Sequence, residues 1–484
     1  MPGLMKMTGV DYFYSTKVAW NMINAFPHSS FVWRGTDGSE ILAHMALRTG
    51  YNNPARPRNL RLEAECNRQL DVHDEMLIAT GWGDGAGGTT LDIIERVRRQ
   101  KDLRNQPSAE FGGVEAFYKR MEKARERLPV HQGEIYLETH RGTYTSHGYL
   151  KSAFREAEKG LRNWEAAHAL MGKGAIDEKP WKRLIFSQFH DCIPGSSTAD
   201  VYDQIVPELQ GIAAHGDAAA QKTLAGKGAL LFNPTALPLP HMDGNRLVKL
   251  PPVSAMLLED LPSVPHTELS CGKHHLSNGR VQARFGDKGE FKELLIDGKA
   301  VFDKAPKPVV YTDIPYDLEA WEIDRDALES GQALELVGLG KPEKGKGWVG
   351  LRQKWATKGG SKVDILWRVR AGGCVIEADV DMDWKEHEKL LRFEVPTGLR
   401  GQHALFASPF GAEWRPQASG DSKASAMWEV PANRWVMAST DGRDEGSFLI
   451  AESKYGFTCH DGLMAVSLLK STKITLINGF PARF

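Results

Sequence analysis

The sequence is poor in cysteine and carries no surplus of charge of either sign. Its 484 residues include five cysteines, which lie far apart and form no CxxC motif. This usage disfavours a thiolate zinc site and is typical of a reducing compartment. Sixty-one basic residues balance sixty-two acidic ones. With no long run of one sign, the balance argues against a dedicated nucleic-acid or membrane surface and favours a small neutral partner.

Long apolar runs and the common phosphate-binding motifs are also missing. No uninterrupted apolar stretch reaches the roughly 18 residues of a membrane-spanning helix, and the start, MPGLMKMTGVDYF, lacks the three regions of a secretory signal. No GxGxxG pattern follows a predicted strand, and neither GK[ST] nor GxSxG occurs. We therefore expect a cytoplasmic protein with no membrane or nucleic-acid partner, and disfavour kinase, nuclease and serine-hydrolase activity.

The hydrophobic pattern changes twice along the chain. Residues 1–106 mix short apolar strands, such as FVW and ILAHMAL, with helical segments. Helical spacing prevails over 107–225, as in LKSAFREAEKGLRNW, and 226–484 shows short alternating runs between turns, as in VQARFGDKGEFKELLIDGKAVF. A chain of this length exceeds one ordinary core. The pattern predicts a multidomain protein: an α/β domain, a helical bundle and an antiparallel β-sandwich region.

The segment FSQFHDCIPGSS places His190 and Asp191 side by side between an apolar run and a Pro-Gly turn. The pair is compatible with a hydrogen-bonded helix end, with a metal ligand and its neighbour, or with half of an acid/base device. After the turn, Ser197 and Asp200 have the spacing of a capping box. The dipeptide alone leaves these alternatives open.

Two further segments carry polar groups in unusual density. GWGDGAGGTT presents Asp84 on a Gly-rich turn, which would suit either a close approach to a ligand or a flexible connection. YLETHRGTYTS is rich in groups that bind sugars or cap helices. Flat aromatic faces that suit a ligand cleft, but are as common in cores, come from Trp20, Trp33, Trp82 and Tyr51.

Together these segments resemble the retaining α-mannosidases of glycoside hydrolase family 38. The resemblance covers almost the whole chain and includes GVDYFYSTKVAWNMINAFPHSSFVWRGTDGSEILAHM, GWGDGAGGTT, YLETHRGTYTS, QFHDCIPGSS and KYGFTCHDGLMAVSLLKS. It implies the C-terminal part of an α/β barrel-like catalytic domain over 1–106, the mannosidase middle domain over 107–225, and a truncated C-terminal β-sandwich region over 226–484. The implied substrate is a mannose-containing oligosaccharide or glycoside.

The resemblance also implies roles for single residues. The histidine of the QFHD block ligates zinc or another divalent cation in the family, which makes His190 the metal ligand and Asp191 a sugar-binding residue. Asp84 becomes the general acid/base, although many members have two adjacent aspartates there and this chain continues with Gly85. Tyr144 and Trp33 are further substrate-binding candidates. Lys17, Tyr51 and Asn52 are positions worth testing as residues that line the sugar pocket.

The family's remaining catalytic groups are not found at matching positions. Its nucleophilic aspartate, in a D-x-F-G motif, and its H-x-D metal ligands precede the segment with which this sequence begins. We therefore expect an incomplete chain without the nucleophile, complemented by a missing N-terminal half, with little turnover alone and with assembly into a homo-oligomer. The alternatives are a non-catalytic carbohydrate-binding protein and a decayed remnant of such an enzyme.

Overall fold

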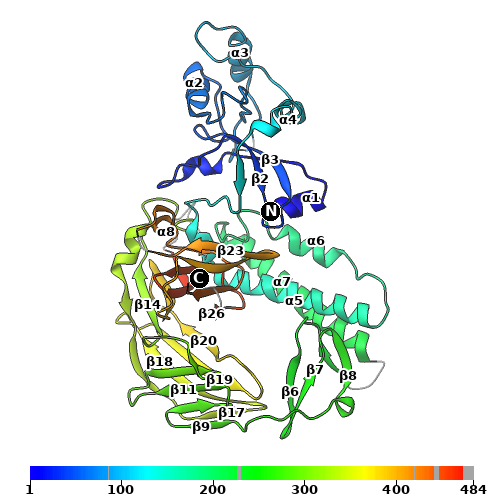
Figure 1. Cartoon of the computed structure of the whole chain (residues 1–484), viewed down its shortest axis with the longest axis vertical. Coiled ribbons are helices and arrows are strands. Elements are labelled where there is room, and N and C mark those ends of the chain that lie inside the picture. The colour runs from blue at the N-terminus through cyan, green and yellow to red at the C-terminus, as the bar shows by residue number, and fades with distance from the viewer. Residues whose placement is uncertain (86, 226–229, 419, 441–445, 473–484) are drawn as a thin grey trace. The chain divides into compact units, whose positions relative to one another are not determined.

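The computed structural model describes residues 1–85, 87–225, 230–418, 420–440 and 446–472. The chain divides into two compact units, Met1–Thr139 and His140–Phe484. The helices of the first unit are α1 Pro2–Met7, α2 Pro57–Cys66, α3 Leu91–Arg99 and α4 Val114–Glu122, and those of the second are α5 Gly148–Leu170, α6 Lys179–Phe186, α7 Ala199–Leu224 and α8 Ser422–Ala426 (Figure 1). None of the helices in these described ranges is long and apolar enough to cross a membrane.

The first unit is built on a four-stranded mixed sheet. Its strands are β1 Tyr12–Ser15, β2 Ser30–Arg34, β3 Glu40–Met45 and β4 Val130–Gln132. The spatial order is β1-β3-β2-β4, with β1 parallel to β3, β2 antiparallel to β3 and β2 parallel to β4. The strands predicted from FVW and ILAHMAL are thus present as β2 and β3.

Both faces of this sheet are buried, which explains why its strands read as continuous apolar runs. Phe31 and Ile41 belong to a core cluster on one face, whereas Val32 and Leu42 pack with Phe117 and other residues of the α4 segment in a second cluster. Side chains alternate between the two faces of a strand. A strand covered on both sides therefore needs apolar residues at consecutive positions.

The second unit begins with a helical layer in which α5 and α7 lie side by side (Figure 1). Leu150, Leu161 and Leu209 are almost fully buried within this layer. The two backbones touch where a Cβ added at Gly216 would lie 2.5 Å from the carbonyl carbon of Gly160. Small residues at this crossing let the helices approach closely, and the helical region predicted within 107–225 is present.

The rest of the second unit is β-rich, and all of its paired strands run antiparallel. One sheet contains β9 Ser270–Gly272, β10 His275–Ser277, β11 Val281–Phe285, β12 Phe291–Ile296 and β13 Lys299–Ala300. A second contains β14 Lys307–Thr312, β15 Gln332–Ala333, β21 Lys389–Pro396, β24 Val430–Pro431, β27 Gly456–His460 and β28 Leu463–Ser471. A third contains β16 Glu335–Leu339, β17 Glu343–Gly345, β18 Trp348–Ala356, β19 Lys362–Arg370 and β20 Glu377–Asp383.

Smaller sheets complete this β-rich part. Four strands pair as β22 His403–Ser408, β23 Gly411–Pro416, β25 Trp435–Ser439 and β26 Gly446–Ile450. Two-stranded ribbons are formed by β5 Leu230–Asn233 with β8 Ser254–Leu257, and by β6 Leu239–Asp243 with β7 Arg246–Leu250. The mixture of α/β, helical and β-rich parts predicted from the sequence is therefore observed.

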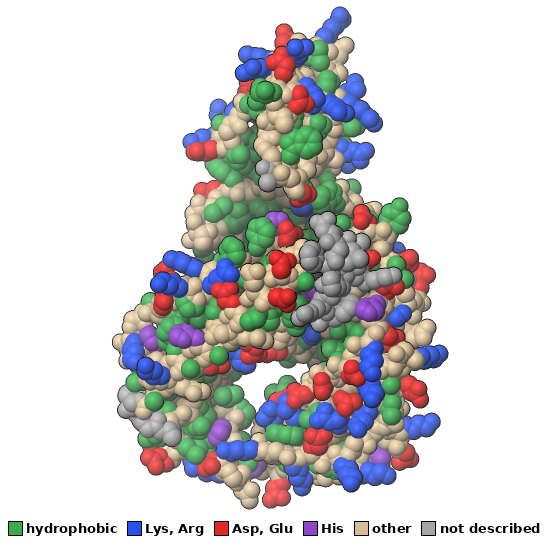
Figure 2. All heavy atoms as spheres, turned by 180° about the vertical axis from the view of Figure 1, so that it is seen from behind, with side chains coloured by type: hydrophobic (Ala, Val, Ile, Leu, Met, Phe, Trp, Pro, Cys, Tyr) green, Lys and Arg blue, Asp and Glu red, His purple; other side chains and the backbone are tan. Residues whose placement is uncertain are grey.

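Charged side chains of both signs are interspersed on the face seen in Figure 2. Surface charges arranged in this way neutralise one another and give no extended field of one sign. The pattern agrees with the balanced composition of the sequence.

A buried ion pair ties the second β-sheet together. The Arg392 guanidinium on β21 contacts the Glu429 carboxylate, and both side chains are at most 4% exposed. Ser467 on β28 donates a hydrogen bond to Glu429 at 2.5 Å, and Arg392 donates to the Trp428 carbonyl at 2.9 Å. Burial raises the pKa of Glu429, while Arg392 opposes that rise. Each charge is tolerated because the other is present.

Loss of one member of this pair should destabilise the unit strongly. Arg392→Met leaves an uncompensated buried carboxylate, so we expect the free energy of unfolding to fall by about 3–5 kcal/mol. The double variant Arg392→Met/Glu429→Gln should recover part of the loss because no charge is then stranded. Urea unfolding followed by circular dichroism measures both. Equal stabilities of the single and double variants would contradict this account.

Candidate functional site

The His190–Asp191 pair lies in a turn that follows α6, with both side chains accessible. The His190 side chain is 74% exposed and the Asp191 side chain 45%. Their Nε2 and Oδ2 atoms are 3.6 Å apart, and the Phe189 ring lies 4.4 Å from the imidazole. The histidine is thus not buried among aliphatic side chains. The pair presents an imidazole and a carboxylate to solvent together.

Backbone hydrogen bonds give the turn its shape. The Asp191 carbonyl accepts from the Ser197 hydroxyl at 2.8 Å and from the Ser196 amide at 3.3 Å. The Ser197 amide donates to the Tyr202 hydroxyl at 2.6 Å. The predicted Ser197–Asp200 capping box is wrong, because α7 has Thr198 at its N-cap and no side-chain cap bond. Ser197 closes the preceding turn instead.

The turn rests on the segment that precedes α5. Gly195 has a φ of +89°, and a Cβ added there would lie 2.7 Å from the Ser146 carbonyl oxygen. Lys151, on the first turns of α5, donates from Nζ to the carbonyls of Ser146 at 2.5 Å, Ile193 at 2.9 Å and Pro194 at 3.4 Å. The two motifs YLETHRGTYTS and QFHDCIPGSS, separate in sequence, therefore meet in space.

The end of the first of these motifs is anchored in the β-rich part. Arg141, whose side chain is fully buried, lies over the Trp428 ring at 3.6 Å and donates to the Ala426 carbonyl at 2.8 Å. Its backbone amide and that of His140 donate to the Glu322 carboxylate. Tyr144 ends the same short 3₁₀ segment, Arg141–Tyr144, and is half-buried.

Asp84 lies in the first unit, exposed on its Gly-rich turn. The Tyr51 hydroxyl donates to its Oδ2 at 2.6 Å, and the neighbouring Gly83 amide donates to the Asn52 side chain at 2.5 Å. The Lys17 ammonium lies 3.9 Å from the centre of the Trp20 ring and 4.8 Å from that of Tyr51. Tyr51 thus joins the carboxylate to an aromatic and cationic cluster.

The structure places Trp33 in a different setting. It is 6% exposed, its ring packs 5.2 Å from that of Phe13, and its indole N–H donates to the Gly133 carbonyl at 2.7 Å. This position favours the core role that most tryptophans have. A sugar contact by Trp33 stays a prediction that we do not carry into the proposed site.

Three family models match the chain one after another. The glycosyl hydrolases family 38 N-terminal domain matches residues 1–134, the alpha mannosidase middle domain 138–226, and the family 38 C-terminal domain 276–474. The chain belongs to glycosyl hydrolase family 38. The family membership predicted from the sequence motifs is confirmed.

Both curated relatives and a solved structure that resemble this chain are named as alpha-mannosidases. The chain is 27% identical to human "Alpha-mannosidase 2C1" over 521 positions, covering 98% of this chain and 49% of the relative. It is also 27% identical to an "Alpha-mannosidase" of Saccharomyces cerevisiae, and the match covers 98% of this chain and 47% of that relative. An alpha-mannosidase structure from Enterococcus faecalis V583 shares the fold, with a TM-score of 0.74 and 13% identity over 98% of this chain and 69% of that one. The chain spans about half the length of these curated relatives.

Within this family 38 chain, the predicted site residues fall into two groups. Asp84 and Trp33 belong to the first unit, whereas His190, Asp191 and Tyr144 belong to the second. The structure brings Asp84 together with Tyr51 and Asn52, and brings the His190–Asp191 turn together with Ser146. The predicted roles of all five residues stay predictions.

The donor set was tested against the cation that the family implies. A catalytic zinc site takes three ligands from protein. No group of three or more His, Cys, Asp or Glu residues suited to a metal ion occurs in the described ranges. His190 and Asp191 are chemically suitable donors, but the pair supplies fewer ligands than such a site takes.

Sequence reasoning missed the residues that support the site. Lys151 is 4% exposed, and its only signal in the sequence is a charge among the apolar positions of α5. Glu138 is 2% exposed and accepts hydrogen bonds from the backbone amides of Ile23 at 2.7 Å and Asn24 at 3.0 Å. Both side chains serve backbone groups distant in sequence. Local patterns carry no record of such contacts.

Replacement of Gly195 by alanine tests the close packing of the turn against Ser146. Gly195→Ala combines a positive φ with a Cβ pressed against Ser146, so we expect a loss of about 1–3 kcal/mol in the free energy of unfolding. Gly174→Ala is the matched control, since nothing lies within 4 Å of a Cβ there. Thermal and urea unfolding compare the two. Equal stabilities would contradict the described packing of the turn.

Proposed function

We propose that this chain acts on α-linked mannosides as part of a retaining family 38 glycosidase. The support is that three domains of one glycosidase family follow one another along it, in order, over nearly its full length. The curated relatives that match 98% of it are named as alpha-mannosidases. The substrate class is a mannose-containing oligosaccharide or glycoside.

The finer architecture belongs to the same proposal. We assign the α/β region that the sequence predicts at 1–106 to a barrel-like catalytic domain that extends to the end of the first unit, the helical layer up to residue 225 to the middle domain, and 226–484 to a β-sandwich region. The four-stranded sheet of the first unit is buried on both faces, as the strands of such a barrel are. The antiparallel sheets of the second unit suit packed sandwiches.

His190 and Asp191 form the sugar-facing arm of the proposed site. An exposed carboxylate beside an imidazole offers acceptors to the hydroxyl groups of a sugar, and the turn holds the two side chains next to each other. His190 would contribute one ligand to a divalent cation such as zinc, whose remaining ligands this pair does not supply. When bound, such an ion orients hydroxyl groups and polarises them.

Asp84 is the proposed general acid/base. Retaining glycosidases use two carboxyl groups about 5–5.5 Å apart, one to protonate the leaving oxygen and one to attack the anomeric carbon. The hydrogen bond from Tyr51 fixes the orientation of the Asp84 carboxyl group, and the adjoining rings offer flat apolar faces to a sugar. We assign the attacking carboxylate to no residue of this chain. Tyr144 is a further candidate for sugar contact.

Mannose binding decides whether the His190–Asp191 arm is functional. Calorimetric titration with excess zinc should show a dissociation constant raised on the order of tenfold or more, or about 1.4 kcal/mol, in His190→Ala and Asp191→Asn. His403→Ala, an exposed histidine on β22, should leave affinity unchanged. Binding that survives chelation and both arm variants would instead favour a non-catalytic carbohydrate-binding role for the β-rich part.

Hydrolysis tests the role of Asp84. Loss of general acid catalysis costs roughly 10²–10⁴-fold in rate, so Asp84→Asn should slow release of nitrophenol from nitrophenyl α-mannoside by that order. A dinitrophenyl mannoside should be slowed less, because its leaving group needs little protonation. Full turnover by Asp84→Asn would contradict the assignment. Slow turnover by the unaltered chain is expected, because the attacking carboxylate is assigned to none of its residues. A normal rate of hydrolysis would contradict that assignment.

A further inference from the structure

Lys151 is the most thoroughly buried amino group next to the His190–Asp191 turn. It is 4% exposed, and its amino group donates hydrogen bonds to the backbone carbonyls of Ser146, Ile193 and Pro194. An ammonium group has three hydrogen-bond donors and no acceptor capacity. The three carbonyls therefore match the three donors, and they come from two segments more than forty residues apart in the sequence.

Burial of a charged amino group costs desolvation free energy, which hydrogen bonds must offset. Burial, together with the charge of Lys454, lowers the pKa of Lys151 to about 7. The neighbouring titratable groups are Lys454, Cys192 and His147. A methionine would fill nearly the same space without desolvating a charge. Lysine differs from such a methionine in the three hydrogen bonds that its amino group makes.

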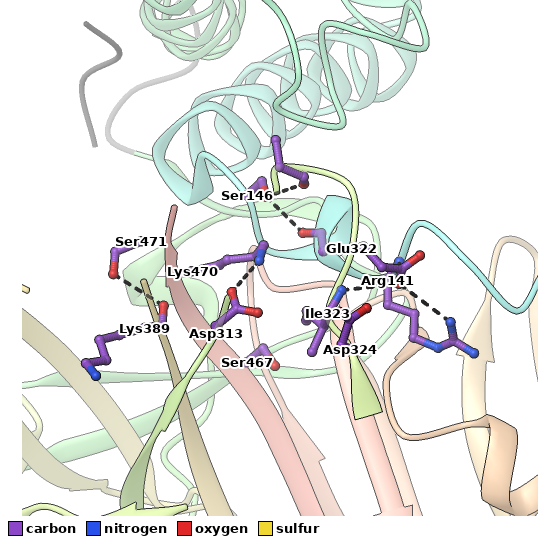
Figure 3. A network of polar contacts seen from close by, with 12 residues as sticks. Arg141, Ser146, Asp313, Glu322, Ile323, Asp324, Lys389, Ser467, Lys470 and Ser471 are labelled. Atoms are coloured by element: carbon purple, nitrogen blue, oxygen red, sulfur yellow. Dashed lines mark hydrogen bonds and ion pairs between the residues drawn. The ribbon is translucent and has the colours of Figure 1, made fainter. Parts of the chain in front are cut away.

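The hydrogen bonds of Lys151 connect the turn to Ser146, which is itself hydrogen-bonded to other segments. Ser146 is held by its own hydroxyl, which donates to the Ala320 carbonyl at 2.7 Å and to the Gly142 carbonyl at 3.1 Å (Figure 3). Ile193 and Pro194 follow Asp191 by two and three residues. Lys151 donates hydrogen bonds both to Ser146 and to the turn. The position of His190 and Asp191 is therefore fixed relative to the β-rich part through Ser146.

We propose that Lys151 is a positioning residue, whose amino group binds the Ile193–Pro194 carbonyls to that of Ser146 and so holds the His190 and Asp191 side chains in the orientation that a mannoside requires. The inference rests on the proposed function and deepens it. Lys151 itself is buried and touches no substrate. Its effect reaches the site only through the backbone of the turn.

The test compares Lys151→Met with Lys159→Met, an exposed lysine on the same helix. Protein with ¹³C-labelled histidine rings gives one resonance per imidazole, and His190→Gln identifies that of His190. In Lys151→Met we expect the His190 resonance to shift or broaden, the His403 resonance to stay, and the dissociation constant for mannose with zinc to rise about tenfold. Lys159→Met should change none of these.

A merely structural role for Lys151 gives a different result. It would lower the unfolding midpoint while the His190 resonance and mannose affinity of the folded protein stay as in the unaltered chain, and this outcome would overturn the proposal. If Lys151→Met does not fold, Lys151→Gln decides, because it keeps two N–H donors on a shorter side chain. A partial shift of the His190 resonance is then expected, and no shift overturns the proposal.

Failure of the two proposals can be told apart. If the unaltered chain binds no mannose with zinc, the proposed function fails, while the His190 resonance in Lys151→Met still decides whether the lysine positions the turn. If the unaltered chain binds mannose and Lys151→Met binds it equally with an unshifted His190 resonance, the positioning role fails and the proposed function stands.

Discussion

The second unit depends on the meeting of two motifs at the backbone of Ser146. Its carbonyl accepts the Lys151 amino group, while the bare Cα of Gly195 leaves room for the same carbonyl on the other side. Backbone polar groups buried at such a junction must find partners, and here Lys151 supplies the hydrogen bonds while Gly195 leaves the space. The exposed His190–Asp191 turn is the outer end of this junction.

Buried charge recurs through this unit. Arg141 lies over Trp428, and Arg392 contacts Glu429. Lys470 contacts Asp313, as Figure 3 shows, and both side chains are inaccessible. Such pairs add little net stability, since desolvation offsets their attraction. They are directional, however, and an unpaired member is costly. They therefore select one arrangement of the strands and of the segment that precedes α5, where an apolar core would tolerate several.

In the first unit, the Asp84 carboxylate is held by side-chain hydrogen bonds and not by buried charge. Asp84 stands on a Gly-rich turn without a core of its own, and the dipeptide Tyr51–Asn52 binds that turn by hydrogen bonds to Asp84 and Gly83. Aromatic rings and the Lys17 ammonium border the same phenol. Rigidity at an exposed position comes from side chains that reach across to the loop.

The amino-acid sequence by itself determined the family, the succession of α/β, helical and β-rich parts, and the strands β2 and β3, because hydrophobic periodicity and motif spacing are local properties. Only the tertiary structure decided that Trp33 packs in a core, that Ser197 closes a turn in place of capping α7, and that Lys151 joins Ser146 to the His190–Asp191 turn. The contacts of Trp33 with Gly133 and of Lys151 with Ile193 link residues far apart along the chain. Their partners are chosen by packing and by the need to satisfy buried polar groups, neither of which leaves a local pattern.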